Sequence, residues 1–298
     1  MGSGSNLQYA CPARRFVACS LAAFLVFSAS QAATIYVDSA GSPTGPGTNW
    51  PAAFQTIQAA IDVAVSNDTV LVTNGTYATG GKAMYNSFTN RIAIDKPITV
   101  RSVNGPAVTA IVGQGPVGAE AVRCAYVGTN AILSGFTLTN GATRTTGSQV
   151  LEASGGGIWS TISGLVSNCL VVSNAALSAG GGVFQGVLRN CTLADNSVRD
   201  TGGGAYSSFL YDCLIAGNIS TNYGGGTSYS SLEGSRLETN SASAGGGSYQ
   251  GSLYNCTLTG NSATSSGGGA CAGSLTNCTL TGNHAQYGGG TAGGNAVN

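Results

Sequence analysis

The sequence predicts an all-β solenoid, a right-handed parallel β-helix with coils of about 21–22 residues and a capping helix at its N-terminus. Three observations predict this fold. Glycine triplets recur at a nearly constant spacing, apolar and polar residues alternate between the triplets, and charged residues are rare. A single repeat of this length cannot bury its apolar side alone, whereas stacked repeats can, and stacked repeats form a solenoid.

The glycine triplets define the repeat. Their spacings are 25, 22, 22, 21, 22 and 21 residues, and they begin at Gly155, Gly180, Gly202, Gly224, Gly245, Gly267 and Gly288. Three glycines in a row would cost a helix about 1 kcal/mol each. They suit tight turns and the close approach of one backbone to another. The triplets therefore predict a non-helical return segment in every coil.

Aligned repeats contain columns of similar residues. Leucine forms one column (Leu188, Leu210, Leu232, Leu253, Leu275), and cysteine with one serine forms the next (Cys169, Cys191, Cys213, Ser235, Cys256, Cys278). An asparagine column follows (Asn174, Asn196, Asn218, Asn240, Asn261, Asn283). Apolar residues two apart have the period of a strand. Each repeat therefore predicts a short strand, a turn at the asparagine and a glycine-rich return.

Two solenoid classes fit this repeat. The pattern L-x-x-C-x-L-x-x-N at 188–196 also matches a leucine-rich repeat, and 22 residues lies within the range of that class. A leucine-rich repeat fills its return segment with further leucines, often on a helix. Here the return contains three glycines followed by small or aromatic residues such as Val183-Phe184 and Ser248-Tyr249. The return segment favours the parallel β-helix.

The N-terminus predicts a secretory signal peptide over residues 1–32. Arg14 and Arg15 precede a 12-residue apolar run at 16–27, and Ser30 and Ala32 fit the small-residue cleavage pattern. A membrane-spanning helix needs about 20 apolar residues. We therefore expect an exported chain with no integral membrane segment after cleavage.

The mature chain divides into two predicted parts, 33–154 and 155–298. The first part begins with a strand at 34–38, followed by helical spacing of Phe54, Ile57, Ile61 and Val65. Short apolar runs at 69–72, 91–94, 98–100 and 109–112 predict the first coils. We expect the helix to cover the open end of the stack, because uncovered strand edges would be exposed there. The second part holds the glycine-triplet coils and ends without a cap, so we expect the native protein to continue past Asn298.

Several segments resemble the pectate-lyase-like superfamily of secreted right-handed β-helix proteins. They are TIYVD at 34–38, TIQAAIDVAVSNDTVLVTNGTY at 56–77, KPITVRSVNG at 96–105 and LSGFTLTNGA at 133–142. The GGG-A/V-aromatic and L-x-x-N elements resemble the repeats of polymorphic outer-membrane proteins. The first resemblance implies carbohydrate-active enzymes. The second implies surface-displayed passengers and adhesins.

Composition excludes some partners. The chain has 11 basic and 11 acidic residues among 298, a net charge of zero, and 7% charged residues. An ordinary soluble domain carries about 25%. A neutral chain with so few charges is not expected to bind nucleic acid or an anionic membrane.

The sequence offers one weak candidate site, formed by Arg189, Asp212 and Glu233. Asp212 and Glu233 fall at neighbouring positions on adjacent coils, and Arg189 lies one coil before Asp212, in the column of Glu233. Adjacent strands are about 4.8 Å apart, so the three side chains are expected to be close. The alternative interpretation is an ordinary solvated cluster of mixed charge, which exposed surfaces commonly contain. His284 is the only histidine, and no G-H-G motif typical of polygalacturonases is present.

The three remaining columns favour structural roles. Seven cysteines follow the signal peptide, without any C-x-x-C pair, so we expect buried thiols, with some disulfides as the alternative, and no metal site. Stacked asparagines are expected to hydrogen-bond along the axis at sharp turns. The aromatic column (Trp159, Phe184, Tyr206, Tyr249) is expected to stack within the structure, with a sugar-binding stripe as the alternative.

These patterns favour an exported, non-catalytic β-helix scaffold, adhesin-like and displayed at the cell surface or outside the cell. The alternative is a polysaccharide lyase, a glycoside hydrolase or a carbohydrate-binding module on the same fold. The expected partner is an extracellular polysaccharide or a component of a host or cell surface. No cofactor is expected, and calcium enters only with the enzyme alternative, because a lyase site of this type would need an acidic cluster.

Overall fold

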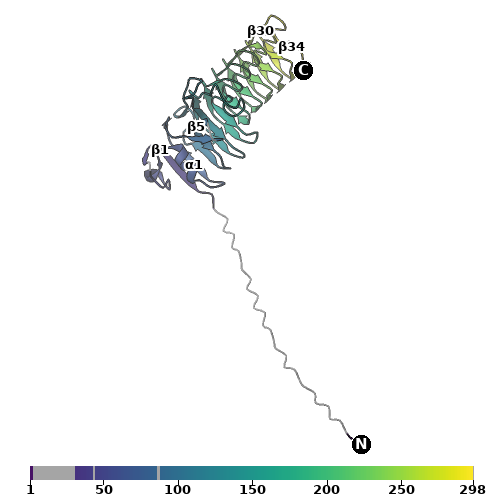
Figure 1. Cartoon of the computed structure of the whole chain (residues 1–298). Coiled ribbons are helices and arrows are strands. Elements are labelled where there is room, and N and C mark those ends of the chain that lie inside the picture. The colour runs from purple at the N-terminus through teal and green to yellow at the C-terminus, as the bar shows by residue number, and fades with distance from the viewer. Residues whose placement is uncertain (3–30, 43, 86–87, 298) are drawn as a thin grey trace. The chain divides into compact units, whose positions relative to one another are not determined.

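The described chain is a stack of coils, each contributing one strand to each of three or four parallel sheets, as the computed structural model shows (Figure 1). The structure describes residues 1–2, 31–42, 44–85 and 88–297. Almost all of the predicted signal peptide, residues 1–32, lies outside the described residues. Among the described residues, no helix is both long enough and apolar enough to span a bilayer.

Sheet A has eleven strands and lies on the side of the coil that follows the glycine-rich return. Its strands are, in spatial order, β1 (Thr34–Ser42), β2 (Thr69–Val72), β6 (Thr99–Ser102), β9 (Ile132–Ser134), β12 (Leu165–Ser167), β16 (Val187–Arg189), β20 (Phe209–Tyr211), β24 (Ser231–Glu233), β28 (Ser252–Tyr254), β32 (Ser274–Thr276) and β35 (Asn295–Val297).

Sheet B follows sheet A within each coil and has nine strands. They are β3 (Gly75–Tyr77), β7 (Thr109–Val112), β10 (Thr137–Thr139), β13 (Leu170–Val172), β17 (Thr192–Ala194), β21 (Leu214–Ala216), β25 (Arg236–Glu238), β29 (Thr257–Thr259) and β33 (Thr279–Thr281).

Sheets C and D complete the coil. Sheet C has ten strands: β4 (Lys82–Met84), β5 (Phe88–Ile94), β8 (Arg123–Val127), β11 (Ile158–Ser160), β15 (Val183–Phe184), β19 (Ala205–Tyr206), β23 (Thr227–Ser228), β27 (Ser248–Tyr249), β31 (Ala270–Cys271) and β34 (Thr291–Ala292). Sheet D has five strands: β14 (Ala175–Ala176), β18 (Ser197–Val198), β22 (Ile219–Ser220), β26 (Ser241–Ala244) and β30 (Ser262–Ser266). Only β4 and β5 pair antiparallel among the described strands.

The core lies inside the coils and is built from the predicted columns. Leu188 pairs in register with Leu210, and Leu210 with Leu232, so one buried leucine row runs along the inner face of sheet A. The return segment holds short strands and glycine triplets in place of a helix. The structure therefore confirms the parallel β-helix over the leucine-rich repeat.

The predicted helix is α1 (Ile57–Val63), preceded by the short 3-10 helix η1 (Trp50–Ala52). The Thr56 side chain accepts a hydrogen bond from the Ala59 amide (3.3 Å) and caps its N-terminus. Ile57 and Ile61 are buried in the core. The helix contacts β1, β2 and β5. Its proposed function as a cover for the end of the stack stays a prediction.

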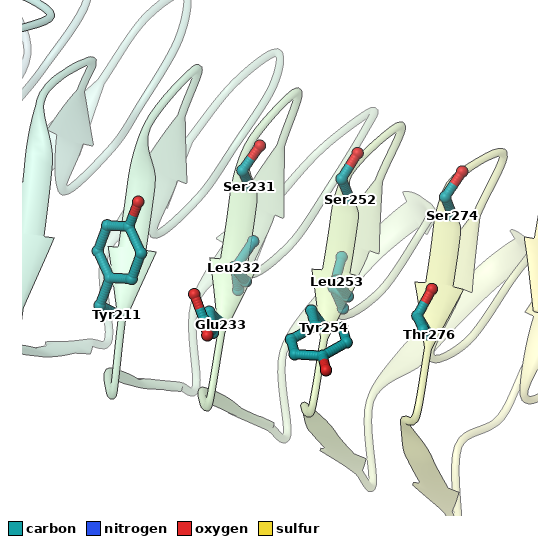
Figure 2. Close-up of a pocket in the computed structure, with 9 residues that line it drawn as sticks. All are labelled: Tyr211, Ser231, Leu232, Glu233, Ser252, Leu253, Tyr254, Ser274 and Thr276. Atoms are coloured by element: carbon teal, nitrogen blue, oxygen red, sulfur yellow. The ribbon is translucent and has the colours of Figure 1, made fainter. Parts of the chain in front are cut away.

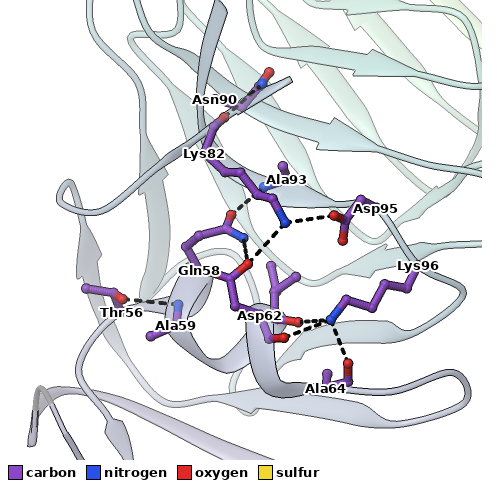
Figure 3. A network of polar contacts seen from close by, with 11 residues as sticks. Thr56, Gln58, Ala59, Asp62, Ala64, Lys82, Asn90, Ala93, Asp95 and Lys96 are labelled. Atoms are coloured by element: carbon purple, nitrogen blue, oxygen red, sulfur yellow. Dashed lines mark hydrogen bonds and ion pairs between the residues drawn. The ribbon is translucent and has the colours of Figure 1, made fainter. Parts of the chain in front are cut away.

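Polar contacts fasten α1 to the neighbouring coils (Figure 3). The Lys96 ammonium donates to the carbonyl oxygens of Ile61, Asp62 and Ala64 at 2.8, 3.0 and 2.6 Å. A cation at a helix C-terminus is favourable, because the last carbonyls have no helical partner. Lys82 also bridges Asp62 and Asp95, at 3.2 and 2.7 Å.

The strands predicted at 34–38, 69–72, 91–94, 98–100 and 109–112 correspond to β1, β2, β5, β6 and β7. Sheets A, B and C run through both predicted parts of the mature chain. The boundary between 154 and 155 stays a prediction.

The asparagine column forms a hydrogen-bonded ladder along the axis, as predicted. The Asn218 side-chain oxygen accepts from both the amide nitrogen and the side-chain nitrogen of Asn196, at 3.0 and 2.9 Å. Its side-chain nitrogen donates to the Leu193 carbonyl (2.9 Å) and to the Asn240 side-chain oxygen (3.0 Å). Asn218 is fully buried, so each of these bonds satisfies a group that water does not reach.

The cysteine column is buried, also as predicted. All seven cysteines among the described residues are free thiols, and six of them are buried. Burial raises the pKa of Cys256 to about 11 and that of Cys124 to about 12. The thiols of Cys256 and Cys124 are therefore protonated at neutral pH, and the thiolate is the reactive form. They pack as small apolar side chains.

Replacing Asn218 with alanine is expected to destabilise the solenoid by about 3 kcal/mol. The change removes the acceptor of two Asn196 donors in the core, the backbone N–H and one side-chain N–H, at about 1–3 kcal/mol each. Chemical denaturation measures the loss. Asn104→Ala is the control, because the Asn104 side chain bonds Asn74 at an exposed position. Equal stability of the two variants would contradict the ladder's contribution.

Gly203→Ala is expected to cost about 2 kcal/mol through overpacking. A methyl group there would lie 2.3 Å from the Gly225 carbonyl oxygen of the next coil, a backbone atom that cannot move alone. At Gly118, the nearest atom to an added methyl group is 3.9 Å away. The thermal midpoint is therefore expected to fall in Gly203→Ala and to stay near the native value in Gly118→Ala.

Candidate functional site

The three candidate residues lie at the end of neighbouring strands on sheet A. Arg189 ends β16, Glu233 ends β24, and Asp212 follows β20 directly. Arg189 pairs in register with Tyr211, and Tyr211 pairs with Glu233. Arg189, Asp212 and Glu233 are all exposed. Arg189 and Glu233 therefore lie in one column, as predicted, and Tyr211 lies between them.

Arg189 contacts this tyrosine and neither acid. The carbon at the centre of its guanidinium group lies 4.3 Å from the centroid of the Tyr211 ring, a cation–π contact. No ion pair among the described residues includes Arg189, Asp212 or Glu233. The three residues do not form the charge cluster that their spacing predicted.

Asp212 points away from the sheet because of its backbone. Its φ of 53° is in the left-handed region, at the turn between β20 and sheet B. Its amide donates to the Glu233 carbonyl oxygen at 3.0 Å. A methyl group added at Gly234 would lie 2.5 Å from the Asp212 Oδ1 atom. The Asp212 carboxylate therefore lies over the neighbouring turn, beside the backbone that follows Glu233.

Glu233 lies in a groove of about 480 Å³ on the outer face of sheet A. Figure 2 shows the side chains in two rows across four coils. One row is Tyr211, Glu233, Tyr254 and Thr276, and the other is Ser231, Ser252 and Ser274. Leu232 and Leu253 also line the groove, and they belong to the buried leucine row.

The period of the strands produces this arrangement. In β24, Leu232 is buried, so Ser231 and Glu233 on either side of it face solvent. The same pattern repeats in β28 with Ser252, Leu253 and Tyr254. In-register pairing then aligns Ser231 with Ser252 and Glu233 with Tyr254. The groove is a surface of hydroxyl groups with two tyrosine rings and one carboxylate.

Sequence reasoning missed the two tyrosines and the serine row. The signal was present, because these residues are the positions next to the leucine column, and the leucine column was correctly placed inside. Tyr211 and Tyr254 flank Glu233 two coils apart, a separation of about 10 Å at the spacing of parallel strands.

The aromatic column lies elsewhere, on sheet C. Its members Trp159, Phe184 and Tyr206 stack on each other, whereas Tyr249 lies outside this stack, against Tyr223 and Tyr229. Trp159 lies 5.3 Å from Tyr126 and 5.8 Å from Phe184 between centroids, and Phe184 lies 5.4 Å from Tyr206. The interplanar angles are 8°, 20° and 8°. Neighbouring rings cover both faces of Trp159 and Phe184, as the structural interpretation predicted, so these faces are not free to stack on a sugar.

Among the described residues, no group of three or more His, Cys, Asp or Glu side chains is arranged to hold a metal ion. Glu233 supplies the one carboxylate in the lining of the groove on sheet A. Hydroxyl groups and tyrosine rings make up most of its chemistry.

Comparison with known proteins shows the fold. A pectate lyase, Pel9A, superposes with a TM-score of 0.56 at 13% identity, over 90% of this chain and 79% of the lyase chain. A rhamnogalacturonan lyase gives a TM-score of 0.40 at 16% identity, over 84% of this chain and 62% of the other. A pectin methylesterase from Erwinia chrysanthemi gives 0.43 at 10% identity, over 84% and 81%.

The similarity to the pectate lyase confirms the predicted right-handed parallel β-helix. No protein-family model matches the chain, and no curated protein sequence matches it. The resemblance to polymorphic outer-membrane repeats stays a prediction.

Proposed function

We propose that this chain is an exported, non-catalytic β-helix that binds a neutral polysaccharide in the groove of sheet A. One observation carries the proposal: Glu233 lies between Tyr211 and Tyr254 on the exposed face of the sheet, beside a row of serines. Flat aromatic rings next to hydrogen-bonding groups match a sugar, which has an apolar C–H face and a hydroxylated edge.

The shape of the groove supports a chain-like ligand. Its two tyrosines are separated by about 10 Å along the axis, so that each ring can contact a different sugar of one extended chain. Tyr254 is 49% exposed, which leaves ring surface free for a ligand. The serines add donors and acceptors at every coil.

The charge of the groove supports a neutral ligand. Glu233 is the only charged residue in its lining. A polyuronate would place its carboxylates near Glu233, and like charges at such distances repel. The nearby guanidinium of Arg189 lies against Tyr211.

Binding is favoured over cleavage because the lining holds one carboxylate. Glycoside hydrolysis generally uses two carboxyl groups on opposite sides of the scissile bond. Among the aligned coils, the acid nearest to Glu233 is Asp212. Its carboxylate lies over the turn at Gly234 and does not line the groove. The fold similarity to Pel9A supports the scaffold, and the ligand is argued from the groove itself. The adhesin-like display of the chain stays a prediction.

Removing the ring of Tyr254 is expected to weaken binding of a neutral polysaccharide about 10-fold. An aromatic contact contributes about 0.5–1.5 kcal/mol beyond the area it buries, and the buried area adds to this. Affinity electrophoresis of the full chain in gels with glucan, xylan, mannan or galactan measures the change. Tyr287→Ala is the matched control, because Tyr287 is 63% exposed and lies outside the groove.

Unchanged migration of Tyr254→Ala in a gel that retards the native chain would contradict the proposed site. Failure of every neutral polysaccharide to retard the native chain would contradict the proposed function. Polygalacturonate is the acidic comparison, and it is expected to retard the chain less.

A second candidate function is a polysaccharide-cleaving enzyme that uses Glu233 and Asp212. The observation that favours it is their proximity, since the Asp212 amide bonds the Glu233 carbonyl and its carboxylate borders Gly234. We expect no new chain ends when the native protein is incubated with neutral or acidic polysaccharides, with or without calcium. Chain ends that disappear in Glu233→Gln or Asp212→Asn, but not in Tyr287→Ala, would establish an enzyme.

A further inference from the structure

The stacked rings of sheet C lose their parallel arrangement beyond Tyr206. Tyr229 stands at 61° to Tyr206 with centroids 5.5 Å apart, and at 76° to Tyr249 at 6.0 Å. Tyr223 lies 4.6 Å from Tyr249 at 34°. Tyr229 is 50% exposed and Tyr223 is 44% exposed. The four tyrosines, 206, 223, 229 and 249, form an open aromatic cluster.

The register explains why this cluster is open. The residue that pairs with Tyr206 on the next coil is Ser228, so the aromatic column is interrupted there. Tyr229 comes one residue later, in a left-handed turn with φ of 52°. Tyr223 precedes the glycine triplet at Gly224. Rings from these two positions cannot join the parallel stack. Tyr223 lies against Tyr249 and Tyr229 meets its neighbours edge to face, and both residues stay about half exposed, unlike the buried Phe184.

Two hollows lie beside the cluster. The first has a volume of about 480 Å³ and is lined by Gln149, Leu177, Ser178, Arg199, Asp200, Thr221 and Asn222. The second has a volume of about 270 Å³, shares Gln149, Ser178 and Asp200 with the first, and reaches Phe184 and Tyr206. The shared residues place the two hollows side by side, and together they are called the polar groove; it borders the tyrosine cluster at Tyr206.

One wall of this groove is held firmly. The Trp159 indole nitrogen donates to the Val150 carbonyl at 2.9 Å. The buried guanidinium of Arg123 donates to the carbonyl oxygens of Leu151 and Ser154, at 2.9 and 2.7 Å. Gln149 therefore projects from a segment that is fixed to the aromatic stack.

The lining of the groove also contains a fixed carboxylate, that of Asp200. The Asn222 side chain donates to the Asp200 Oδ1 atom at 2.9 Å. The Asp200 carbonyl accepts from the Ser220 hydroxyl (2.8 Å) and the Tyr223 amide (3.1 Å). Burial raises the pKa of Tyr206, and the charges of Tyr229 and Asp200 raise it further. Asp200 thus lies close to the tyrosine cluster and to the amide of Asn222.

We propose that the groove at Asp200 and the tyrosine cluster form a second binding site, for a neutral oligosaccharide. The groove offers a carboxylate, two side-chain amides and several hydroxyl groups to the edge of a sugar. The open rings of Tyr223 and Tyr229 offer an apolar surface to its face. Arg199 and Asp200 contribute opposite charges, so the site has no net charge to select an ionic ligand.

This site is independent of the groove on sheet A, because the two are lined by different residues. They lie on successive strands of the same coils, since Tyr206 ends β19 and Tyr211 ends β20. Two sites on one solenoid would raise the avidity for a long glycan without any additional contact.

Protection of tyrosines from iodination by a bound sugar shows where the sugar lies on the protein. The protein is treated with an iodinating reagent, with and without neutral hexasaccharides of glucose, xylose, mannose, galactose or arabinose, and modification of each tyrosine is measured by mass spectrometry. Variants with Tyr223→Ala and Tyr229→Asn test the second site in a Tyr254→Ala background, in which binding to the groove of sheet A is already weakened. Asparagine is chosen at 229 because it tolerates the left-handed conformation.

At least one neutral hexasaccharide is expected to protect Tyr223 and Tyr229 in the Tyr254→Ala protein, and to leave Tyr287 fully modified. Residual affinity of this protein is expected to fall about 10-fold in the Tyr223→Ala, Tyr229→Asn variant, and the variant is expected to keep the circular dichroism spectrum of the parent protein. Protection of Tyr254 alone in the native protein would overturn the second site while supporting the first. The second site would also be overturned by a lack of protection with all five sugars, or by protection only with hexagalacturonate.

Discussion

Hydrogen bonds between successive parallel strands hold each coil about 4.8 Å from the next. A side chain on one coil therefore lies directly over its counterpart on the next, and every column of the sequence becomes a row in space. Such a row is stable only when its members tolerate this contact. Leucines pack, and asparagines donate and accept along the axis. Glycines let the backbones of neighbouring coils approach, since a methyl group added at Gly203 would lie only 2.3 Å from the Gly225 carbonyl oxygen.

The same spacing explains why the chain carries so few charges. Two like charges in one row repel by about 1 kcal/mol even in bulk water, and the repulsion accumulates along the stack. Only 7% of the residues are charged. Those on sheet A are placed with uncharged neighbours in their row: Arg189 next to Tyr211, and Glu233 between Tyr211 and Tyr254. The result is an outer surface of hydroxyl groups and rings, which suits a long, uncharged ligand.

The interior of this fold could be predicted from sequence, because it repeats. Leu188, Cys191 and Asn196 recur at the same position in each coil, and the structure places their columns inside as expected. On the outer face the serine row repeats, but the neighbouring row changes residue type from Tyr211 to Glu233 to Tyr254, so it gave no column of one residue type to recognise. The contacts of the charged candidates depend on local features that only coordinates show, and their role as a site stays a prediction. Tyr211 separates Arg189 from Glu233, and a left-handed backbone turns Asp212 toward Gly234. The tyrosine cluster was missed because Tyr229 is displaced by one position from the aromatic column.

The geometry of the stack also bears on catalysis. Adjacent positions in one row are about 4.8 Å apart and alternate positions about twice that. These distances resemble the carboxyl separations of about 5–5.5 Å in retaining and about 6.5–9.5 Å in inverting glycosidases. A β-helix can thus create a hydrolytic pair by placing two acids in one exposed row. In this chain the row containing Glu233 has tyrosine on both sides and Arg189 and Thr276 at the next positions. The row that could hold a catalytic pair instead holds rings beside Glu233, and the proposed binding function rests on that arrangement.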